Sequence, residues 1–165
     1  MSAEVEALIQ SLRGNDGEAR QSAAERLAQL GPDAQAAAVP LVEACAIDDD
    51  NLREFVTAAL EELGPPLPSE VGTLAALVSH VSLDVAYWAA TLLGRLKDHA
   101  ASAVDALAMV LDKHPQGSVK QRAAWALGQI GPAAESARGT LQQAAAGSDK
   151  RLARLAQEAL DKLPG

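Results

Sequence analysis

Aromatic residues and cysteine are nearly missing from this chain of 165 residues. Phe, Tyr and Trp make up 2% of the sequence, and Cys45 is the single cysteine. Hydrophobic residues nevertheless reach 48%, so a core has to be built from Ala, Leu and Val, which favours closely packed helices over a sheet. A lone cysteine excludes an intramolecular disulfide, and we interpret Cys45 as a small core residue.

Long hydrophobic runs and a basic leader are also absent. No stretch approaches the roughly 20 apolar residues that a membrane-spanning helix needs. The N-terminal segment MSAEVEALIQ has neither the basic region nor the apolar run of a signal peptide. We therefore expect a cytoplasmic protein without a membrane contact. The sequence leaves its oligomeric state open, with a monomer favoured.

Patterns that carry catalysis or hold a metal are missing as well. The three histidines are followed by Val81, Ala100 and Pro115, and no His-x₃-His or Cys-His spacing suits zinc. The acidic run 48–50 lacks the alternating ligands and the distal Glu of a calcium loop. The sequence thus predicts a protein that is not an enzyme and that uses no metal or cofactor.

Positive charge is scarce in the first part of the chain. Residues 1–70 carry 14 acids and 4 bases, whereas residues 71–165 carry 8 acids and 10 bases, within a net charge of -8. One interpretation is a set of solvated helix faces that keep the protein soluble. The other is a docking surface for a basic partner. Either way, sequence-independent binding of nucleic acid is disfavoured, because it depends on clustered Lys and Arg.

A repeat of about 33 residues is the dominant feature that is present. A leucine recurs three residues before another leucine or isoleucine, with steps of 33, 33, 34 and 33 residues between the second members. The pairs are Leu27/Leu30, Leu60/Leu63, Leu93/Leu96, Leu127/Ile130 and Leu160/Leu163. Self-similarity at such a period predicts stacked supersecondary units.

Each repeat is predicted to hold two helices, which we call A and B. Apolar residues 3, 7 and 11 positions before the final Leu or Ile share one face of B. Start signals are Asp16, Asp49, Ser82, Ser118 and Asp149, and stop signals are Gly31-Pro32, Gly64-Pro65 and Gly131-Pro132. Lys97 and Pro164 replace the glycine in repeats three and five. The A helices are predicted at 3–12, 34–46, 70–80, 101–113 and 134–146.

This pattern predicts an all-α fold, a right-handed α-solenoid of five antiparallel helix pairs. Stacking neighbours bury a continuous core, so the five leucines at 27, 60, 93, 127 and 160 should all be buried. We expect one domain over 1–165, with repeats at about 1–31, 32–64, 65–98, 99–132 and 133–165. Pro40 lies inside the second predicted A helix and is expected to bend it.

Two segments give this repeat a family resemblance. Arg122-Ala-Ala-Trp-Ala-Leu-Gly-Gln-Ile-Gly-Pro132 and Ala38-Val-Pro-Leu-Val-Glu-Ala44 resemble HEAT repeats, in particular the short bacterial kind also found in phycobilin lyases. The resemblance implies an armadillo-like scaffold for protein binding, with the B helices lining the concave side. It also implies an acid–base ladder, kept in part by the acids Glu18 and Asp84 and by the bases Arg20, Arg53 and Lys120.

A candidate binding face follows from the B-helix pattern. Positions nine and five residues before the last core residue point away from the core. We predict that the partner contacts Glu54, Ala58, Tyr87, Thr91, Gln121 and Trp125, because exposed aromatic rings are typical interface anchors. Alternatively, Trp125 folds over a neighbouring helix. Trp88 is interpreted as packing.

Two other functions stay open at this stage. A chromophore-binding and client-binding protein like the phycobilin lyases would use the same groove for a small molecule. Nucleic-acid binding would use the more basic repeats three to five, through Arg95, Lys113, Lys120 and Arg122. The sequence favours a protein partner.

Overall fold

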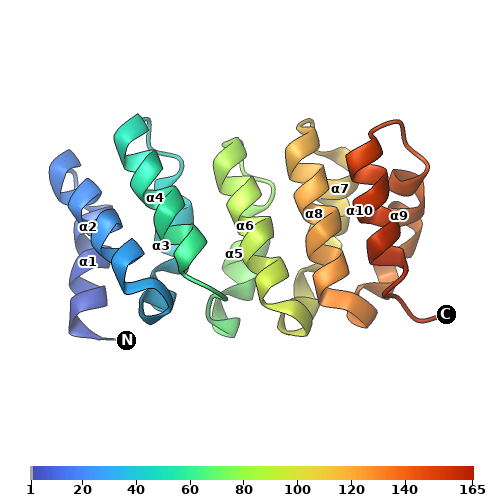
Figure 1. Ribbon diagram of the computed structural model, residues 1–165, viewed down its shortest axis with the longest axis horizontal. Helices are drawn as coiled ribbons and strands as arrows, with labels where there is room; N and C mark the ends of the chain where they lie inside the picture. Colours follow the sequence, from blue (N-terminus) through green and yellow to red (C-terminus); the bar gives the residue numbers. More distant parts are fainter. Residues whose placement is uncertain (1) are drawn as a thin grey trace. The chain divides into compact units, whose positions relative to one another are not determined.

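The computed structural model describes residues 2–165, which form ten α-helices and four short 3₁₀-helices without any strand (Figure 1). The A helices are α1 (Ala3–Arg13), α3 (Ala38–Ala44), α5 (Val71–Leu77), α7 (Val104–Lys113) and α9 (Arg138–Ala145). The B helices are α2 (Gly17–Leu30), α4 (Asp50–Glu62), α6 (Leu83–Arg95), α8 (Gly117–Ile130) and α10 (Lys150–Leu160). The 3₁₀-helices are η1 (Gly31–Ala37), η2 (Pro68–Glu70), η3 (Lys97–Ala103) and η4 (Gly131–Ala137).

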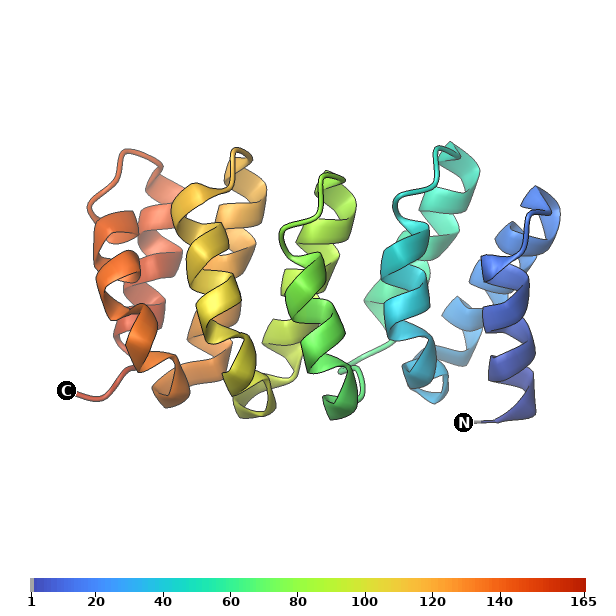
Figure 2. The ribbon, with the colours of Figure 1, turned by 180° about the vertical axis from the view of Figure 1, so that it is seen from behind.

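The helices form two compact units, one ending at Leu67 and the other spanning Pro68–Gly165. In the first unit, α2 packs against α1 and α4. In the second, α8 lies between α6 and α10, while α7 packs against α8 and α9 packs against α10 from the A side (Figures 1 and 2). The predicted all-α solenoid of stacked helix pairs is confirmed. A single domain over both units stays a prediction.

Aspartate caps start three of the five B helices. Asp16 accepts from the amides of Glu18 and Ala19, and Asp49 and Asp149 cap α4 and α10 in the same way. These carboxylates satisfy amides that have no partner within the helix. Ser82 occupies the equivalent place in α6 without a side-chain cap. The predicted cap at Ser118 is wrong, because α8 begins earlier, at Gly117.

Left-handed residues end four of the repeats. The φ angles are 54° at Gly31, 74° at Gly64 and 71° at Gly131, as the sequence signals predict. Lys97 takes the same turn with φ 53°, although its side chain makes this conformation unfavourable.

Three A helices begin later than predicted. A 3₁₀-helix follows the left-handed residue, so α3, α7 and α9 start at Ala38, Val104 and Arg138. Pro40 consequently falls in the first turn of α3 rather than inside a long helix. An amide there would have no partner within the α-helix, so this position requires no bend.

The core consists of the predicted leucines together with alanines and valines. Leu27, Leu60, Leu93 and Leu127 are fully buried, at 0% exposure. Leu160 is only half-buried, so the prediction that all five are buried is wrong at this position. Its helix packs against α8 and α9, and no further B helix follows among the described residues.

Replacing Leu93 by Ala is expected to lower the free energy of unfolding by about 2–5 kcal/mol, through lost apolar burial and a cavity. Leu160→Ala should cost less, because its side chain is already partly in solvent. Urea unfolding of both variants measures the difference. An equal loss in the two variants would contradict the burial pattern.

Candidate functional site

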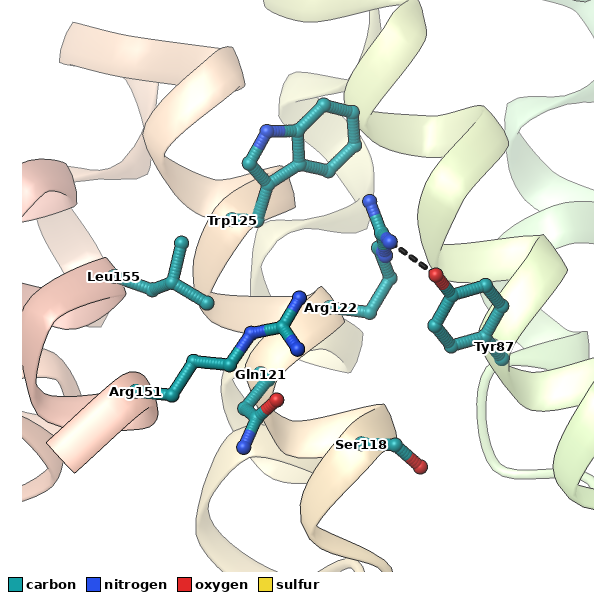
Figure 3. A pocket seen from close by; sticks show the side chains of 7 residues that line it. All are labelled: Tyr87, Ser118, Gln121, Arg122, Trp125, Arg151 and Leu155. Atoms are coloured by element: carbon teal, nitrogen blue, oxygen red, sulfur yellow. Dashed lines mark hydrogen bonds between the residues drawn. The ribbon is translucent and has the colours of Figure 1, made fainter. Parts of the chain in front are cut away.

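Two aromatic rings and one guanidinium group meet on the B helices of the second unit. Tyr87 lies on α6, and Arg122 and Trp125 lie one turn apart on α8 (Figure 3). The Arg122 Cζ atom is 4.6 Å from the centroid of the Tyr87 ring and 5.0 Å from that of the Trp125 ring. Both distances fall within the range of cation–π attraction. We call these three residues the aromatic cluster.

The tyrosine hydroxyl fixes the guanidinium further. Arg122 Nη2 donates a hydrogen bond to Tyr87 Oη, the dashed line in Figure 3. A guanidinium carries five N–H donors in one plane, so this bond leaves other donors of Arg122 available. The cluster therefore holds a cation in place while it is still able to bind.

Trp125 packs against the neighbouring B helix through one part of its ring. A methyl group built on Gly94 of α6 would fall 2.9 Å from Trp125 Cε3 and 3.1 Å from Ala126 Cα, too close for any side chain. The alternative that Trp125 folds over a neighbouring helix is thus right for this part of the ring. The whole residue is half-buried, and its remaining surface lines a pocket.

This pocket has a volume of about 150 Å³ and spans α6, α8 and α10. Its lining comprises Tyr87, Ser118, Gln121, Arg122, Trp125, Arg151 and Leu155. In Figure 3 the Arg151 side chain extends from α10 toward α8, so that its guanidinium lies beside Gln121, with Leu155 one turn further along α10. The lining of the pocket thus combines two cationic side chains with aromatic and aliphatic ones.

Gln121 connects the two helices that carry the arginines. Its Nε2 donates to Asp149 Oδ2 at 2.9 Å, while Asp149 Oδ1 accepts from the amides of Arg151 and Leu152, each at 3.0 Å. The cap bond from Leu152 and the bond from Gln121 hold the pKa of Asp149 below its usual range. Arg151 therefore lies in the first turn of α10, which is tied to α8 through Asp149 and Gln121.

The two arginines of the pocket have no acidic partner. Within residues 2–165, no carboxylate forms an ion pair with the guanidinium of Arg122 or Arg151. Arg154, one turn after Arg151, does pair with Glu158, at 2.6 Å. The nearby Asp149 is occupied by its amide and glutamine donors. The charge of Arg151 also lowers the pKa of Asp149, so Asp149 offsets part of the positive charge at the pocket without forming an ion pair.

Comparison with known proteins identifies the family of this helical repeat. A family described as HEAT repeats matches residues 71–161, more than half of the chain. The chain belongs to the HEAT-repeat family. No curated protein matches it.

Solved structures share the HEAT-type fold over almost the whole chain. An engineered protein is 22% identical with a TM-score of 0.67, covering 98% of this chain and 81% of its own. A designed armadillo repeat protein in complex with the peptide (KR)4 is 17% identical with a TM-score of 0.66, covering 96% and 80%. The complex of CpcE and CpcF of phycocyanin lyase from Nostoc sp. PCC7120 is 21% identical with a TM-score of 0.60, and the match covers 95% of this chain and 98% of that one.

Three of the six predicted contact residues line one pocket, one is buried, and two lie on the first unit. Tyr87, Gln121 and Trp125 line the pocket of the second unit. Thr91 is buried at 5% exposure and donates from Oγ1 to the Tyr87 carbonyl at 2.8 Å, so it supports the HEAT helix instead of meeting a partner. Glu54 and Ala58 are exposed on α4 of the first unit, in a separate shallow depression beside Asp50, Arg53, Thr57 and Glu61.

Four pocket residues were not among the predicted contacts: Ser118, Arg122, Arg151 and Leu155. Ser118 and Arg151 stand twelve positions before the last core residue, one helical turn ahead of the predicted face. Extending that face by a turn would have found them. Arg122 and Leu155 share the column of Trp88, which is confirmed as packing at 9% exposure.

The basic residues of the acid–base ladder that the HEAT resemblance implies make several other contacts, and the ladder itself stays a prediction. Arg20 donates to the Gly14 carbonyl at 3.2 Å and Lys120 to the Asp112 carbonyl at 2.7 Å. Arg53 pairs with Asp50 of its own helix. The interaction that does recur between HEAT repeats is Gln21 with the cap Asp49, at 3.2 Å, and Gln121 with Asp149.

The described residues contain no group of three or more His, Cys, Asp and Glu side chains arranged to hold a metal ion. No helix among them has the length and apolar character needed to cross a membrane.

Acid is expected to destabilise the folded HEAT repeats by protonating the two helix-cap residues Asp49 and Asp149, each of which also binds a glutamine of the preceding repeat or helix. The pKa values of Asp49 and Asp149 lie below the ordinary value of 3.8, so both carboxylates stabilise the folded state above that pH. This stabilisation is lost as the pH falls through the folded-state values. We expect the urea midpoint of the Asp49→Asn, Asp149→Asn variant to fall less between pH 6 and pH 3 than that of the wild type. Asp33→Asn, at an exposed site in η1, is the matched control; parallel curves for all three proteins would contradict the assignment.

Proposed function

We propose that this HEAT-repeat chain is a non-catalytic scaffold that binds a protein partner through the exposed faces of its B helices. The observation that carries the proposal is the pocket on α6, α8 and α10, where the aromatic cluster is half-exposed. Trp, Tyr and Arg are the residues most enriched in binding hot spots. Here the three occur together, already held in position by their mutual contacts.

The size of the pocket favours a side chain of a protein over a chromophore. Sites for drug-sized molecules usually measure about 300–1,000 Å³, whereas this one measures about 150 Å³. The likeness to the CpcE–CpcF complex and to the designed protein with its bound peptide concerns the fold, at 21% and 17% identity. A peptide on B helices is the simpler use of the surface found here.

Nucleic-acid binding is less well supported. Among the cations predicted for it, Lys120 already donates to the Asp112 carbonyl. Counterion release from a phosphate backbone requires several free cations on one track. A cytoplasmic, monomeric state remains a prediction of the same proposal.

Truncating Trp125 tests the proposed site. Trp125→Ala should weaken binding of the partner by about 2 kcal/mol or more. It should also cost about 1–3 kcal/mol of stability, because part of the ring packs at Gly94. The partner is first captured by a photo-crosslinking residue at the exposed position Ser118, and its dissociation constant is then measured for each variant. Leu160→Ala is the control for stability loss alone; normal binding by Trp125→Ala would remove Trp125 from the site.

The acidic first unit predicts a salt-dependent association rate. If Glu54 and Glu61 on α4 steer a basic segment of the partner, association should slow about threefold or more between about 50 and 300 mM salt, with little change in dissociation. Glu54→Gln, Glu61→Gln should reproduce the slower rate at low salt, and Glu6→Gln on α1 should not. If the stopped-flow association rate changes neither with salt nor with these substitutions, the acidic residues of the first unit do not steer a partner and serve solubility alone.

A further inference from the structure

We infer that the pocket on α6, α8 and α10 accepts a carboxylate side chain from an acidic segment of the partner, held between Arg122 and Arg151. The inference rests on the proposed function and names the chemistry that the site recognises. It is independent of the acidic surface of the first unit, which belongs to different helices.

Neither guanidinium group of the pocket forms an ion pair with a carboxylate of residues 2–165. Arg122 and Arg151 come from successive B helices and both line the pocket. The flat fork of arginine matches a carboxylate with two parallel hydrogen bonds, so an anion in the pocket would be attracted by both guanidinium groups. Other arginines of this unit already have carboxylates, Arg138 with Glu135 at 2.7 Å and Arg154 with Glu158.

Contacts within the second unit fix the guanidinium of Arg122 and the backbone of Arg151. The Arg122 guanidinium is held by both rings and by the Tyr87 hydroxyl. The first turn of α10, which carries Arg151, is tied to α8 through Gln121 and Asp149. Little motion of the Arg122 side chain or of the Arg151 backbone remains to be lost when an anion binds, which reduces the entropic cost of association.

The walls of the pocket distinguish an acidic peptide from a nucleic acid. Trp125 and Leu155 offer apolar surface that suits the aliphatic stem of Glu or Asp, and the pocket has room for one such side chain. A phosphate backbone would need a row of cations on either side of it. On α10, the next arginine after Arg151, Arg154, already pairs with Glu158.

A peptide titration tests the inference directly. The probe is a blocked twelve-residue peptide with four Glu residues among Leu and Gly, and its matched form has Gln in place of Glu. Binding is followed by tryptophan fluorescence in a Trp88→Phe background, where Trp125 is the remaining tryptophan. We expect the Glu peptide to change the emission and the Gln peptide to bind at least about tenfold more weakly.

Substitutions assign this binding to the two arginines. Arg151→Gln should weaken binding of the Glu peptide about tenfold or more, while Arg154→Gln, on the same helix, should leave it unchanged. Arg122→Lys keeps the charge without the fork and should weaken it as well; urea unfolding of each variant checks that the fold is retained. Equal binding of the Gln peptide, an equal loss in Arg154→Gln, or tighter binding of a twelve-residue oligothymidylate through the same arginines would each overturn the inference.

The same variants separate this inference from the proposed function. If the photo-crosslinked partner is lost in Trp125→Ala but retained in Arg151→Gln, the scaffold function stands and the carboxylate assignment falls. If Trp125→Ala binds the partner normally, the proposed site fails, and the peptide titration still decides whether the pocket binds a carboxylate.

Discussion

The second unit depends on the close approach of its B helices, which only small residues allow. A methyl group on Gly94 would meet Trp125 and Ala126 of α8, and one on Gly128 would lie 3.2 Å from Ala159 of α10. Alanines fill the remaining contacts, which explains how a chain with 2% aromatic residues buries its core. Because adjacent helices run this close, their outward side chains reach one another, and the aromatic cluster and the pocket are direct consequences.

The repeated positions could be predicted because their causes are local. Asp49 and Asp149 cap helices through amides two or three residues away, and Gly31 and Gly131 take a left-handed turn that most residues avoid. Burial followed from helical period alone at four of five leucines. The prediction failed at Leu160 because its helix has a neighbouring B helix on one side only among the described residues, and helical period does not report how many neighbours a helix has.

The candidate site was predictable only in part, because it depends on contacts between helices. Helical period placed Tyr87, Gln121 and Trp125 on one face, and the structure brings them to one pocket. It could not foresee that Thr91 turns inward onto the Tyr87 carbonyl, or that Arg122 lies between two rings from different helices. The positions of these side chains depend on the space beside Gly94 and on hydrogen bonds such as that from Arg122 to Tyr87.

Gln121 and Asp149 show how the packing of repeats and the chemistry of the pocket are linked. Had Asp149 been free, it would be the natural partner of Arg151, two positions along the chain. Its oxygens instead accept from two amides and from Gln121, so the carboxylate stabilises the helix start and the contact between repeats. In the first unit Asp49 accepts from Gln21 in the same way. Asp149 thus attracts Arg151 without forming an ion pair with it, which leaves the N–H donors of Arg151 and the remaining donors of Arg122 available to an anion from outside.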